Sequence, residues 1–333
     1  MQIRVLNEND IKKVMDMRAA IEATKDALKA YSNGGADIPL RANLDVAEHN
    51  GQSLYMYGYV PSENALGVKI VSVYPDNIAK NLTSVPATMV TLNSETGEVN
   101  SLIDGTYLTR LRTGAIAGAA TDELAKKNSK IFALFGTGGQ AETQLEAVLN
   151  VRDIKEVRVF DISKDRAVDF AKRMQKKLEA DFDFEIKAVD SADEAIENAD
   201  IITTVTTAKD PVFDGKKVKK GCHINGVGSY TPEMSEIPEY IITHAQKIYV
   251  DTFDGAVSES GDFIKPIKNG TFNPDKDITG ELGEKLLGKV SGRENTDEIT
   301  FFETTGSAVL DLVVAQKILE TAEKEHIGQI IEM

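Results

Sequence analysis

The segment IFALFGTGGQA, residues 131–141, carries more information about the fold than any other part of the chain. Its first five residues are apolar and predict a short buried strand, and helical periodicity begins at Ala141. Gly136 permits the tight turn between the two elements, and Gly138 lets a pyrophosphate group approach the backbone. The small Ala141 allows the helix to pack closely on the strand, and the unpaired N–H groups of its first turn attract phosphate. The segment therefore predicts a dinucleotide-binding turn.

An acidic residue follows at the place where such a turn needs one. Asp161 ends the next predicted strand, where a carboxylate accepts hydrogen bonds from the ribose of NAD and repels the extra phosphate of NADP. Lys164 and Arg166 follow closely, so the sequence favours NAD while NADP stays possible. The alternative is a glycine-rich turn of an unrelated α/β protein, with Asp161 as a helix cap. The candidate cofactor-binding residues here are Gly136, Thr137, Gly138, Gly139, Gln140 and Asp161.

The rest of the C-terminal half alternates between short apolar runs and helical segments. Strands are predicted at residues 131–135, 157–160, 184–188, 201–205, 223–227 and 248–251, and helices at residues 141–150, 164–180 and 192–199. Such alternation is typical of a doubly wound parallel sheet. A last helix over residues 306–325 has Ala308, Leu312, Ala315 and Leu319 on one face, and we expect it to return to the N-terminal domain.

The N-terminal part of the chain has a different period. Two helices are predicted before Gly34, and period-two alternation then predicts strands. These strands cover residues 41–46, 54–60, 66–74, 87–92 and 98–103. A helix over residues 107–127 follows them. The length suggests two domains, which we expect to be residues 1–122 with 308–333, largely antiparallel, and residues 123–307, parallel.

Composition narrows the range of partners. The 333 residues include 38 Lys and Arg against 53 Asp and Glu, which gives a formal net charge of −15. A field of this sign argues against nucleic acid and anionic membranes as partners. No apolar run approaches the roughly 18 residues that a membrane span needs, and the first residues are too charged for a signal peptide.

The usage of cysteine and histidine predicts a reducing compartment and no metal chemistry. Cys222 is the only cysteine, so an internal disulfide is impossible, and we expect a cytoplasmic location. A buried structural role for this thiol is favoured over a nucleophilic one. The four histidines are scattered and lack the spacing of a zinc site, so no metal site is expected.

Three basic residues are candidates to hold a substrate carboxylate. Lys69 shares a strand face with Val71 and Val73, and a lysine on an apolar face is costly unless an anion meets it. The alternative is an edge-strand lysine that opposes aggregation. Arg41 stands at the start of a strand and Arg112 near a helix rich in small residues, and a solvated side chain is the alternative for both. Together the three could form a carboxylate clamp.

With these residues identified, the chain resembles the ornithine cyclodeaminase/mu-crystallin family over nearly its whole length. The segments that carry the resemblance are GVKIVS (67–72), PATMV (86–90), DGTYLTRLRTG (104–114), GTGGQ (136–140) and TTGSA (304–308). The second and third are much more specific to the family than the glycine-rich turn. The resemblance implies a Rossmann-type doubly wound parallel sheet domain and an α/β domain that binds substrate and dimerises through its sheet.

The resemblance also implies an activity and a set of site residues. Members transfer hydride at the α-carbon of amino acids or cyclic imino acids, and include ornithine cyclodeaminases, alanine dehydrogenases and ketimine reductases. Arg41, Lys69 and Arg112 match positions that hold the substrate carboxylate, Thr113 one beside the cofactor, and Thr304 one near the nicotinamide. We therefore expect a homodimeric NAD(H)-dependent oxidoreductase of a small amino or imino acid, in which Lys69 donates the proton that an imine needs.

One segment departs from the family pattern. Cyclodeaminases carry an aspartate in a Gly-Asp-x-Pro loop, where this chain reads GSYTP (228–232). The loop favours the reductase and dehydrogenase branches, with Ser229 as a candidate to orient a water molecule. Two alternatives stay open: an ornithine cyclodeaminase, which forms L-proline and ammonia with NAD recycled, and a non-catalytic binding protein similar to mu-crystallin. A 2-hydroxy-acid dehydrogenase lacks support, since no His–Asp or His–Glu pairing is visible.

Overall fold

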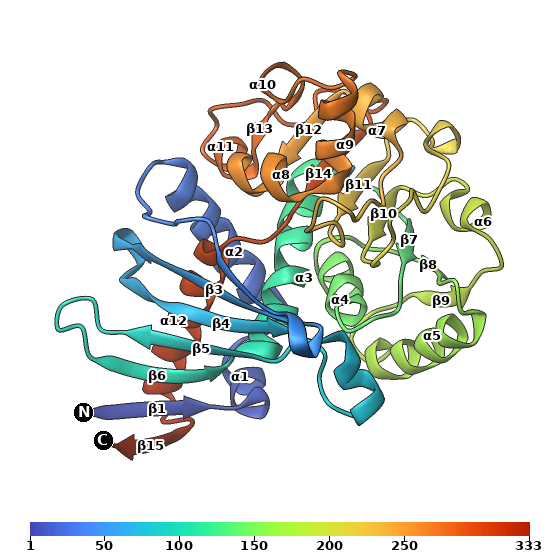
Figure 1. The fold of residues 1–333 in the computed structure, drawn as a ribbon. Coiled ribbons are helices and arrows are strands. Elements are labelled where there is room, and N and C mark those ends of the chain that lie inside the picture. The colour runs from blue at the N-terminus through green and yellow to red at the C-terminus, as the bar shows by residue number, and fades with distance from the viewer. The chain divides into compact units, whose positions relative to one another are not determined.

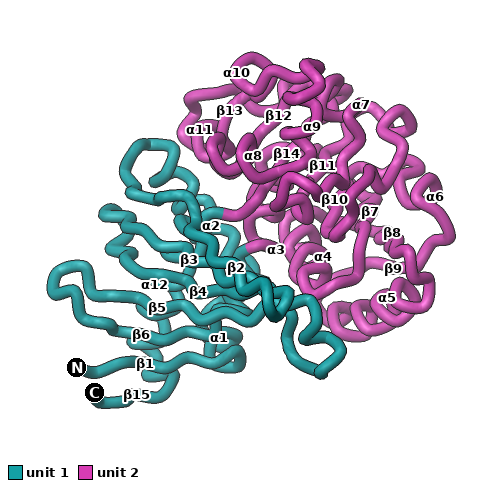
Figure 2. Tube along the Cα trace, viewed as in Figure 1, with its two compact units in different colours: residues 1–112, 307–333 teal, residues 113–306 magenta.

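The computed structural model describes the whole chain, residues 1–333. The chain forms two compact units: unit 1 is residues 1–112 with 307–333, and unit 2 is residues 113–306 (Figure 2). The sequence predicts a domain boundary after residue 122, and the structure has it after Arg112. Both positions lie within one helix, α3 (Gly105–Leu124). Because this helix is continuous, no loop marks the change in the sequence.

Unit 1 is built on a seven-stranded sheet with the order β15-β1-β6-β5-β4-β3-β2 (Figure 1). Its strands are β1 (Gln2–Leu6), β2 (Ala42–Val46), β3 (Gly51–Val60), β4 (Ala65–Val73), β5 (Ala87–Leu92), β6 (Val99–Asp104) and β15 (Gln329–Glu332). Strands β2 to β6 pair in succession as an antiparallel meander, as the alternation predicts. β1 pairs with β6 in parallel, and β15 pairs with β1 antiparallel.

The N-terminus differs from the prediction. The sequence predicts only helices before the meander, whereas the chain begins with strand β1 and continues with α1 (Glu8–Val14) and α2 (Met17–Ser32). β1 has five residues, and both of its partner strands lie far away in the sequence. A strand of this length is determined by its tertiary partners more than by its own residues, so the local pattern does not reveal it.

Helix α12 (Ala308–Lys324) covers one face of this sheet. It packs on β3, β4 and β5 and on α2, as expected for a last helix that returns to the N-terminal domain. Side chains alternate along β4, so that Lys69 and Val71 are buried on the covered face while Ile70 points the other way. β4 lies between β3 and β5, so the edge-strand explanation of Lys69 is wrong.

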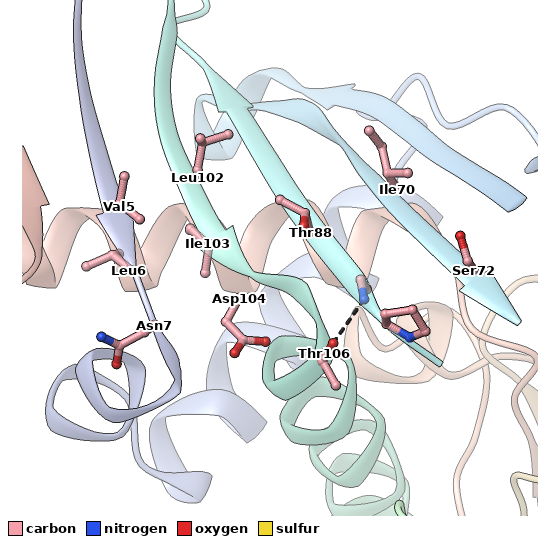
Figure 3. A pocket seen from close by; sticks show the side chains of 12 residues that line it. Val5, Leu6, Asn7, Ile70, Ser72, Thr88, Leu102, Ile103, Asp104 and Thr106 are labelled. Carbon is pink, nitrogen blue, oxygen red and sulfur yellow. Dashed lines mark hydrogen bonds between the residues drawn. The ribbon is translucent and has the colours of Figure 1, made fainter. Parts of the chain in front are cut away.

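The opposite face of the sheet is apolar and partly exposed. The strand register aligns Tyr57, Val68, Val90 and Leu102 in one row across β3 to β6. Tyr57 is 45% exposed, and Ile70 beside this row is 39% exposed. Figure 3 shows a hollow at one end of the face, with Leu102 and Ile70 on its two sides. An exposed apolar row of this kind is typical of a protein–protein interface.

Unit 2 is a doubly wound parallel sheet, as predicted. Its strand order is β13-β12-β14-β11-β10-β7-β8-β9, and the strand pairs are parallel. The strands are β7 (Ile131–Phe135), β8 (Glu156–Phe160), β9 (Glu185–Ala188), β10 (Ile201–Thr204), β11 (His223–Gly226), β12 (Lys247–Val250), β13 (Gly280–Glu281) and β14 (Thr300–Glu303). The helices are α4 (Ala141–Val151), α5 (Lys164–Leu178), α6 (Ala192–Ile196), α7 (Glu239–His244), α8 (Phe253–Glu259), α9 (Gly261–Asn269), α10 (Pro274–Asp277) and α11 (Leu282–Leu286).

Strand β7 shows how the sheet is buried on both faces. Phe132 and Leu134 belong to one apolar core, and Ala133 and Phe135 to the other. A continuous apolar run is what a parallel strand with helices on both faces requires. The sequence misses the central strand β14, which is only four residues long and lies between β11 and β12. None of the helices has both the length and the apolar composition needed to cross a membrane.

Candidate active site

Lys69 lies at the centre of a buried group of charges on unit 1. Its Cα partners in the neighbouring strands are Met56 and Met89, and all three side chains are buried. The Nζ atom of Lys69 lies 2.6 Å from Oδ2 of Asp311, in the first turn of α12. An ammonium group enclosed by methionines is tolerated only when an anion meets it, and Asp311 is that anion.

Arg112 reaches the same carboxylate from helix α3. Its Nε atom donates to Oδ1 of Asp311 at 2.9 Å, and its side chain is 7% exposed. The alternative of a solvated helix arginine is therefore wrong. No hydrogen bond within the chain uses its Nη1 and Nη2 atoms. These two donors form the edge of a guanidinium group that binds a carboxylate through two parallel hydrogen bonds.

Arg41 adds a third positive charge to this group. It stands immediately before β2, is half-buried, and its charge acts on Lys69. Burial, and after it repulsion from Arg112, lowers the pKa of Lys69 to about 7, while Asp311 opposes the shift and Arg41 adds to it. The structure therefore brings together the three cations that the sequence names, and one of them has a pKa suited to proton transfer near neutral pH.

Asp311 is absent from the sequence prediction. It stands in the run AVLDLVVA (308–315). All the remaining residues of this run are apolar, and every side chain in it is buried. A carboxylate on such a helix face needs a buried cation, and Lys69 on its apolar strand face needs a buried anion. An acidic residue on an apolar helix face and a lysine on an apolar strand face are therefore the sequence signal that could have predicted this pair.

On unit 2, the glycine-rich turn has the shape that a dinucleotide needs. Gly136 has a φ of +96°, and a Cβ atom there would lie 2.7 Å from the carbonyl oxygen of Val205, so only glycine fits. A Cβ atom at Gly138 or Gly139 would meet nothing within 4 Å, which leaves open space beside the backbone. Gln140 makes no side-chain cap bond, and the N–H groups of Glu142 and Thr143 in the first turn of α4 make no hydrogen bond within the chain, so they are available to phosphate. The residues present fit a dinucleotide.

Asp161 follows β8 and lies against the same turn. Its Oδ2 atom accepts hydrogen bonds from N and Oγ1 of Thr137, at 3.1 and 2.7 Å. Its Oδ1 atom accepts from N of Ser163 and Nη2 of Arg166, at 2.9 and 2.8 Å. Burial acts to raise the pKa of this carboxyl, but these hydrogen bonds outweigh burial and hold the pKa below its usual value. An ionised carboxylate beside the turn is the feature that selects NAD over NADP.

Thr113 and Thr304 are both buried within unit 2. The carbonyl oxygen of Thr113 accepts a hydrogen bond of 2.9 Å from Nε2 of Gln144, which joins α3 to α4. Oγ1 of Thr304 donates to Oδ2 of Asp251 at 2.6 Å, which fixes the backbone just after β14. Their contacts with a cofactor stay a prediction.

Ser229 is fully buried in the loop after β11. Its hydroxyl donates to the carbonyl oxygen of Met234 at 3.1 Å and accepts from Oγ of Ser260 at 3.2 Å. Oγ of Ser260 also lies 2.7 Å from Oε1 of Glu303. The hydroxyl of Ser229 is thus engaged by protein atoms on both sides, and its role in orienting a water molecule stays a prediction.

A group of buried carboxyl groups lies at the carboxyl end of the parallel strands, and the sequence does not predict it. The group consists of Glu236, Asp251, Asp262 and Glu303. Burial raises the pKa of all four, that of Glu236 to about 7 and that of Asp262 to about 6. Glu236 accepts hydrogen bonds from the N–H groups of Thr206 and Gly228 and so ties the loops after β10 and β11 together. Doubly wound sheets bind their ligands at this end of the strands.

A dinucleotide turn on one unit and buried cations around a single carboxylate on the other define a class of proteins that bind a nucleotide cofactor and an organic acid. A family model described as "Ornithine cyclodeaminase/mu-crystallin family" matches residues 1–326. The chain belongs to this family, which confirms the resemblance inferred from its motifs.

Similar proteins cover at least 98% of the chain. A Delta(1)-pyrroline-2-carboxylate reductase of Bacillus cereus is 38% identical over 98% of this chain and 99% of its own. The structure of Thermococcus litoralis Delta(1)-pyrroline-2-carboxylate reductase in complex with NADH and L-proline is 40% identical, with a TM-score of 0.93 over 98% of this chain and 99% of that one. An archaeal alanine dehydrogenase dimer with bound NAD is 32% identical, with a TM-score of 0.91 over 100% of both chains.

Proposed function

We propose that this protein is an NAD(H)-dependent oxidoreductase that reduces a cyclic imino acid of the Δ1-pyrroline-2-carboxylate type. The observation that carries the proposal is the charge balance on unit 1, where Lys69 and Arg112 share the single carboxylate of Asp311. A buried positive charge remains beside the two unused Nη donors, and a substrate carboxylate would supply its partner. The relatives named as pyrroline-2-carboxylate reductases, at 38% and 40% identity, support this class of substrate.

In this proposal, unit 1 binds the substrate and protonates it. Arg112 and Arg41 hold the carboxylate, which fixes the position of the α-carbon next to it. Lys69 in its ammonium form donates a proton to the imine nitrogen, and the protonated imine carbon becomes electrophilic. Because the pKa of Lys69 is about 7, its amine regains a proton from water between turnovers at neutral pH.

Unit 2 holds the cofactor in this proposal. The N–H groups of Gly138, Gly139 and Gln140, which make no hydrogen bond within the chain, bind the pyrophosphate, and Asp161 accepts hydrogen bonds from the ribose hydroxyls. Thr113 is a proposed neighbour of the cofactor, and Thr304 a proposed neighbour of its nicotinamide. Bound NADH supplies the hydride that adds to the α-carbon, so that the imine becomes a secondary amine.

The proposal is tested by following NADH oxidation by the purified protein with three substrates: Δ1-pyrroline-2-carboxylate, Δ1-piperideine-2-carboxylate, and pyruvate with ammonia. Rapid oxidation with a cyclic imine supports it, and oxidation with pyruvate and ammonia alone replaces it with an alanine dehydrogenase. No oxidation, together with ammonia release from L-ornithine and trace NAD, identifies a cyclodeaminase. Inactivity in both assays favours a binding protein.

The substitution Asp161→Ser is expected to shift the cofactor preference from NADH toward NADPH. The variant removes a charge-assisted hydrogen bond to the ribose, which should raise the Kd for NADH about tenfold or more. It also removes the repulsion of the 2′-phosphate and releases Arg166, now paired with Asp161 at 2.8 Å, to bind that phosphate. Fluorescence titrations with both cofactors measure the change.

Asp183 offers a matched control for this variant. It is an exposed aspartate paired with Lys155, and it precedes β9 at the amino end of the parallel strands, whereas the glycine-rich turn and Asp161 follow β7 and β8 at their carboxyl ends. Asp183→Ser should leave both dissociation constants within about twofold, as expected for an exposed ion pair. An unchanged NADH/NADPH preference in Asp161→Ser would show that Asp161 does not bind the ribose.

A homodimer formed through the open face of the unit 1 sheet is also part of the proposal. The row of Tyr57, Val68, Val90 and Leu102 supports it, because folded chains seldom leave such an apolar surface in water. The dimer named for the archaeal alanine dehydrogenase supports the same assembly. Figure 3 shows Leu102, Thr88 and Ile70, which line a pocket at one end of this face.

The substitution Val68→Glu is expected to separate this dimer into monomers. It places one carboxylate from each copy at the centre of the apolar face, where an unpaired charge is costly. Light scattering after gel filtration should give the mass of one 36.3 kDa chain for the variant and twice that mass for the native protein. Leu287→Glu, at a position 38% exposed on unit 2, is the control and should keep the native mass. A dimeric Val68→Glu variant would place the interface elsewhere.

A cytoplasmic location completes the proposal. Cys222 is buried, and burial raises the pKa of its thiol to about 12, so it is the unreactive structural residue that the sequence predicts. A chain with a single buried thiol is typical of proteins that stay in reducing compartments, which supports this location.

A further inference from the structure

We propose that Asp311 is a positioning residue of the substrate site: it fixes the guanidinium group of Arg112 and holds the ammonium group of Lys69, and so prepares both cations for the substrate. This inference rests on the proposed function, because it assigns the orientation and protonation of two residues that act in it. Asp311 comes from the last helix of the chain, far in sequence from both of its partners.

The two carboxylate oxygens of Asp311 accept hydrogen bonds from two different cations. Oδ2 accepts from Nζ of Lys69 at 2.6 Å, and Oδ1 accepts from Nε of Arg112 at 2.9 Å. The residue is 0% exposed, so water does not replace either partner. Asp311 also lies in the first turn of α12, where the helix dipole stabilises a negative charge. Its carboxylate therefore lies between two cations, at the positive end of a helix.

The contact at Nε determines which way Arg112 presents its other donors. A guanidinium group is planar, so one hydrogen bond at Nε together with the packing around a buried side chain sets the direction of Nη1 and Nη2. Those two atoms make no hydrogen bond within the chain. Asp311 thus occupies one edge of the guanidinium group and leaves the bidentate edge for a carboxylate ligand.

The contact at Nζ determines the protonation of Lys69. The groups that face this amine are Asp311 from α12, Arg112 from α3 and Arg41 from the segment before β2, together with the apolar Met56 and Met89. Burial and both arginines favour the neutral amine, and Asp311 is the one group among them that favours the ammonium form. Without its charge, Lys69 would be deprotonated at neutral pH and could not protonate an imine.

The test is the variant Asp311→Asn, which keeps the shape of the side chain and removes its charge. We measure kcat/KM for Δ1-pyrroline-2-carboxylate and NADH against pH. The native activity should fall as pH rises through the pKa of Lys69, since the donor must be protonated, and in the variant this fall should move to lower pH by about one unit or more. The KM for the imino acid should rise about tenfold, while the Kd for NADH stays within about twofold. An unchanged pH profile and KM would overturn the proposal.

A second variant separates positioning from a purely structural role. Asp311→Glu keeps the negative charge but lengthens the side chain, so its pH profile should stay near the native one while KM for the imino acid rises. If Asp311 only supported the fold, both variants would lose activity in parallel with no shift of the pH profile. That result would also overturn the proposal.

An NMR titration gives a readout that does not depend on turnover. Lysine labelled with 13C at Cε reports the protonation of Lys69, and the Lys69→Met variant identifies its signal. The midpoint of this titration should lie lower in Asp311→Asn than in the native protein, and equal midpoints would refute the coupling. A native protein that oxidises NADH with none of the imines would refute the proposed function alone, because the titration still decides whether Asp311 controls Lys69.

Discussion

The Lys69→Met variant is expected to lose between about 100-fold and 10,000-fold in kcat/KM for the imino acid, the range for removal of a general acid. Lys69 lies between Met56 and Met89 on neighbouring strands, so a third methionine fits the same space and the sheet should fold normally. Asp311 keeps Arg112 as a partner at 2.9 Å, so the variant does not leave a buried carboxylate alone. The loss should therefore reflect the missing proton donor.

Steady-state kinetics over a range of pH check this prediction. The native kcat/KM should fall as pH rises past about 7, the pKa of Lys69, and the variant should lack this fall because no group there titrates. The Kd for NADH should not change, since the proposed cofactor residues belong to unit 2. Lys317→Met, which removes an ammonium group paired with Glu63, is the matched control and should keep native activity. Nearly intact turnover in Lys69→Met would rule out Lys69 as the donor.

The Gly138→Val variant is expected to weaken NADH binding by about 100-fold or more without loss of stability. A Cβ atom at Gly138 would meet nothing within 4 Å, so the valine costs the folded chain little. In a dinucleotide-binding turn, however, this space is where the pyrophosphate must approach the backbone, and a branched side chain fills it. NADH fluorescence titration and thermal unfolding measure the two effects separately.

Gly136 provides the contrast for this experiment. Its φ is +96°, and a Cβ atom would lie 2.7 Å from the carbonyl oxygen of Val205. Gly136→Val should therefore lower the free energy of unfolding by about 1–3 kcal/mol. It should also weaken the binding of NADH. The two glycines thus separate a ligand-binding role from a folding role within one turn. Native affinity for NADH in Gly138→Val would mean that the pyrophosphate lies elsewhere.

The sequence predicts those parts of the fold whose signals are local. Both sheets follow from short segments with a clear period, and the glycine-rich turn follows from its own residues. The strands that the sequence misses, β1, β13, β14 and β15, have two to five residues each and depend on partners elsewhere in the chain. Their residues alone do not distinguish them from loops, because the pairing that stabilises them is tertiary.

In the candidate site, too, the sequence predicts the residues with local signals and misses those that depend on tertiary contacts. Lys69 is recognisable as a cation on an apolar strand face, whereas Asp311 requires knowledge that a helix from the end of the chain packs on that strand. The buried carboxyl groups of unit 2 are missed for a related reason. Glu236 and Asp262 look like ordinary surface acids in the sequence, and only the fold shows that loop N–H groups surround them.

The return of residues 307–333 to unit 1 has a consequence for how the protein is made. A ribosome synthesises all of unit 2 before it reaches α12, so the strands of unit 2 are complete while unit 1 still lacks its covering helix. During that interval β4 has no Asp311 to meet Lys69, and its apolar face is uncovered. Domains fold as units during synthesis, so the unit whose synthesis begins first is the last to fold.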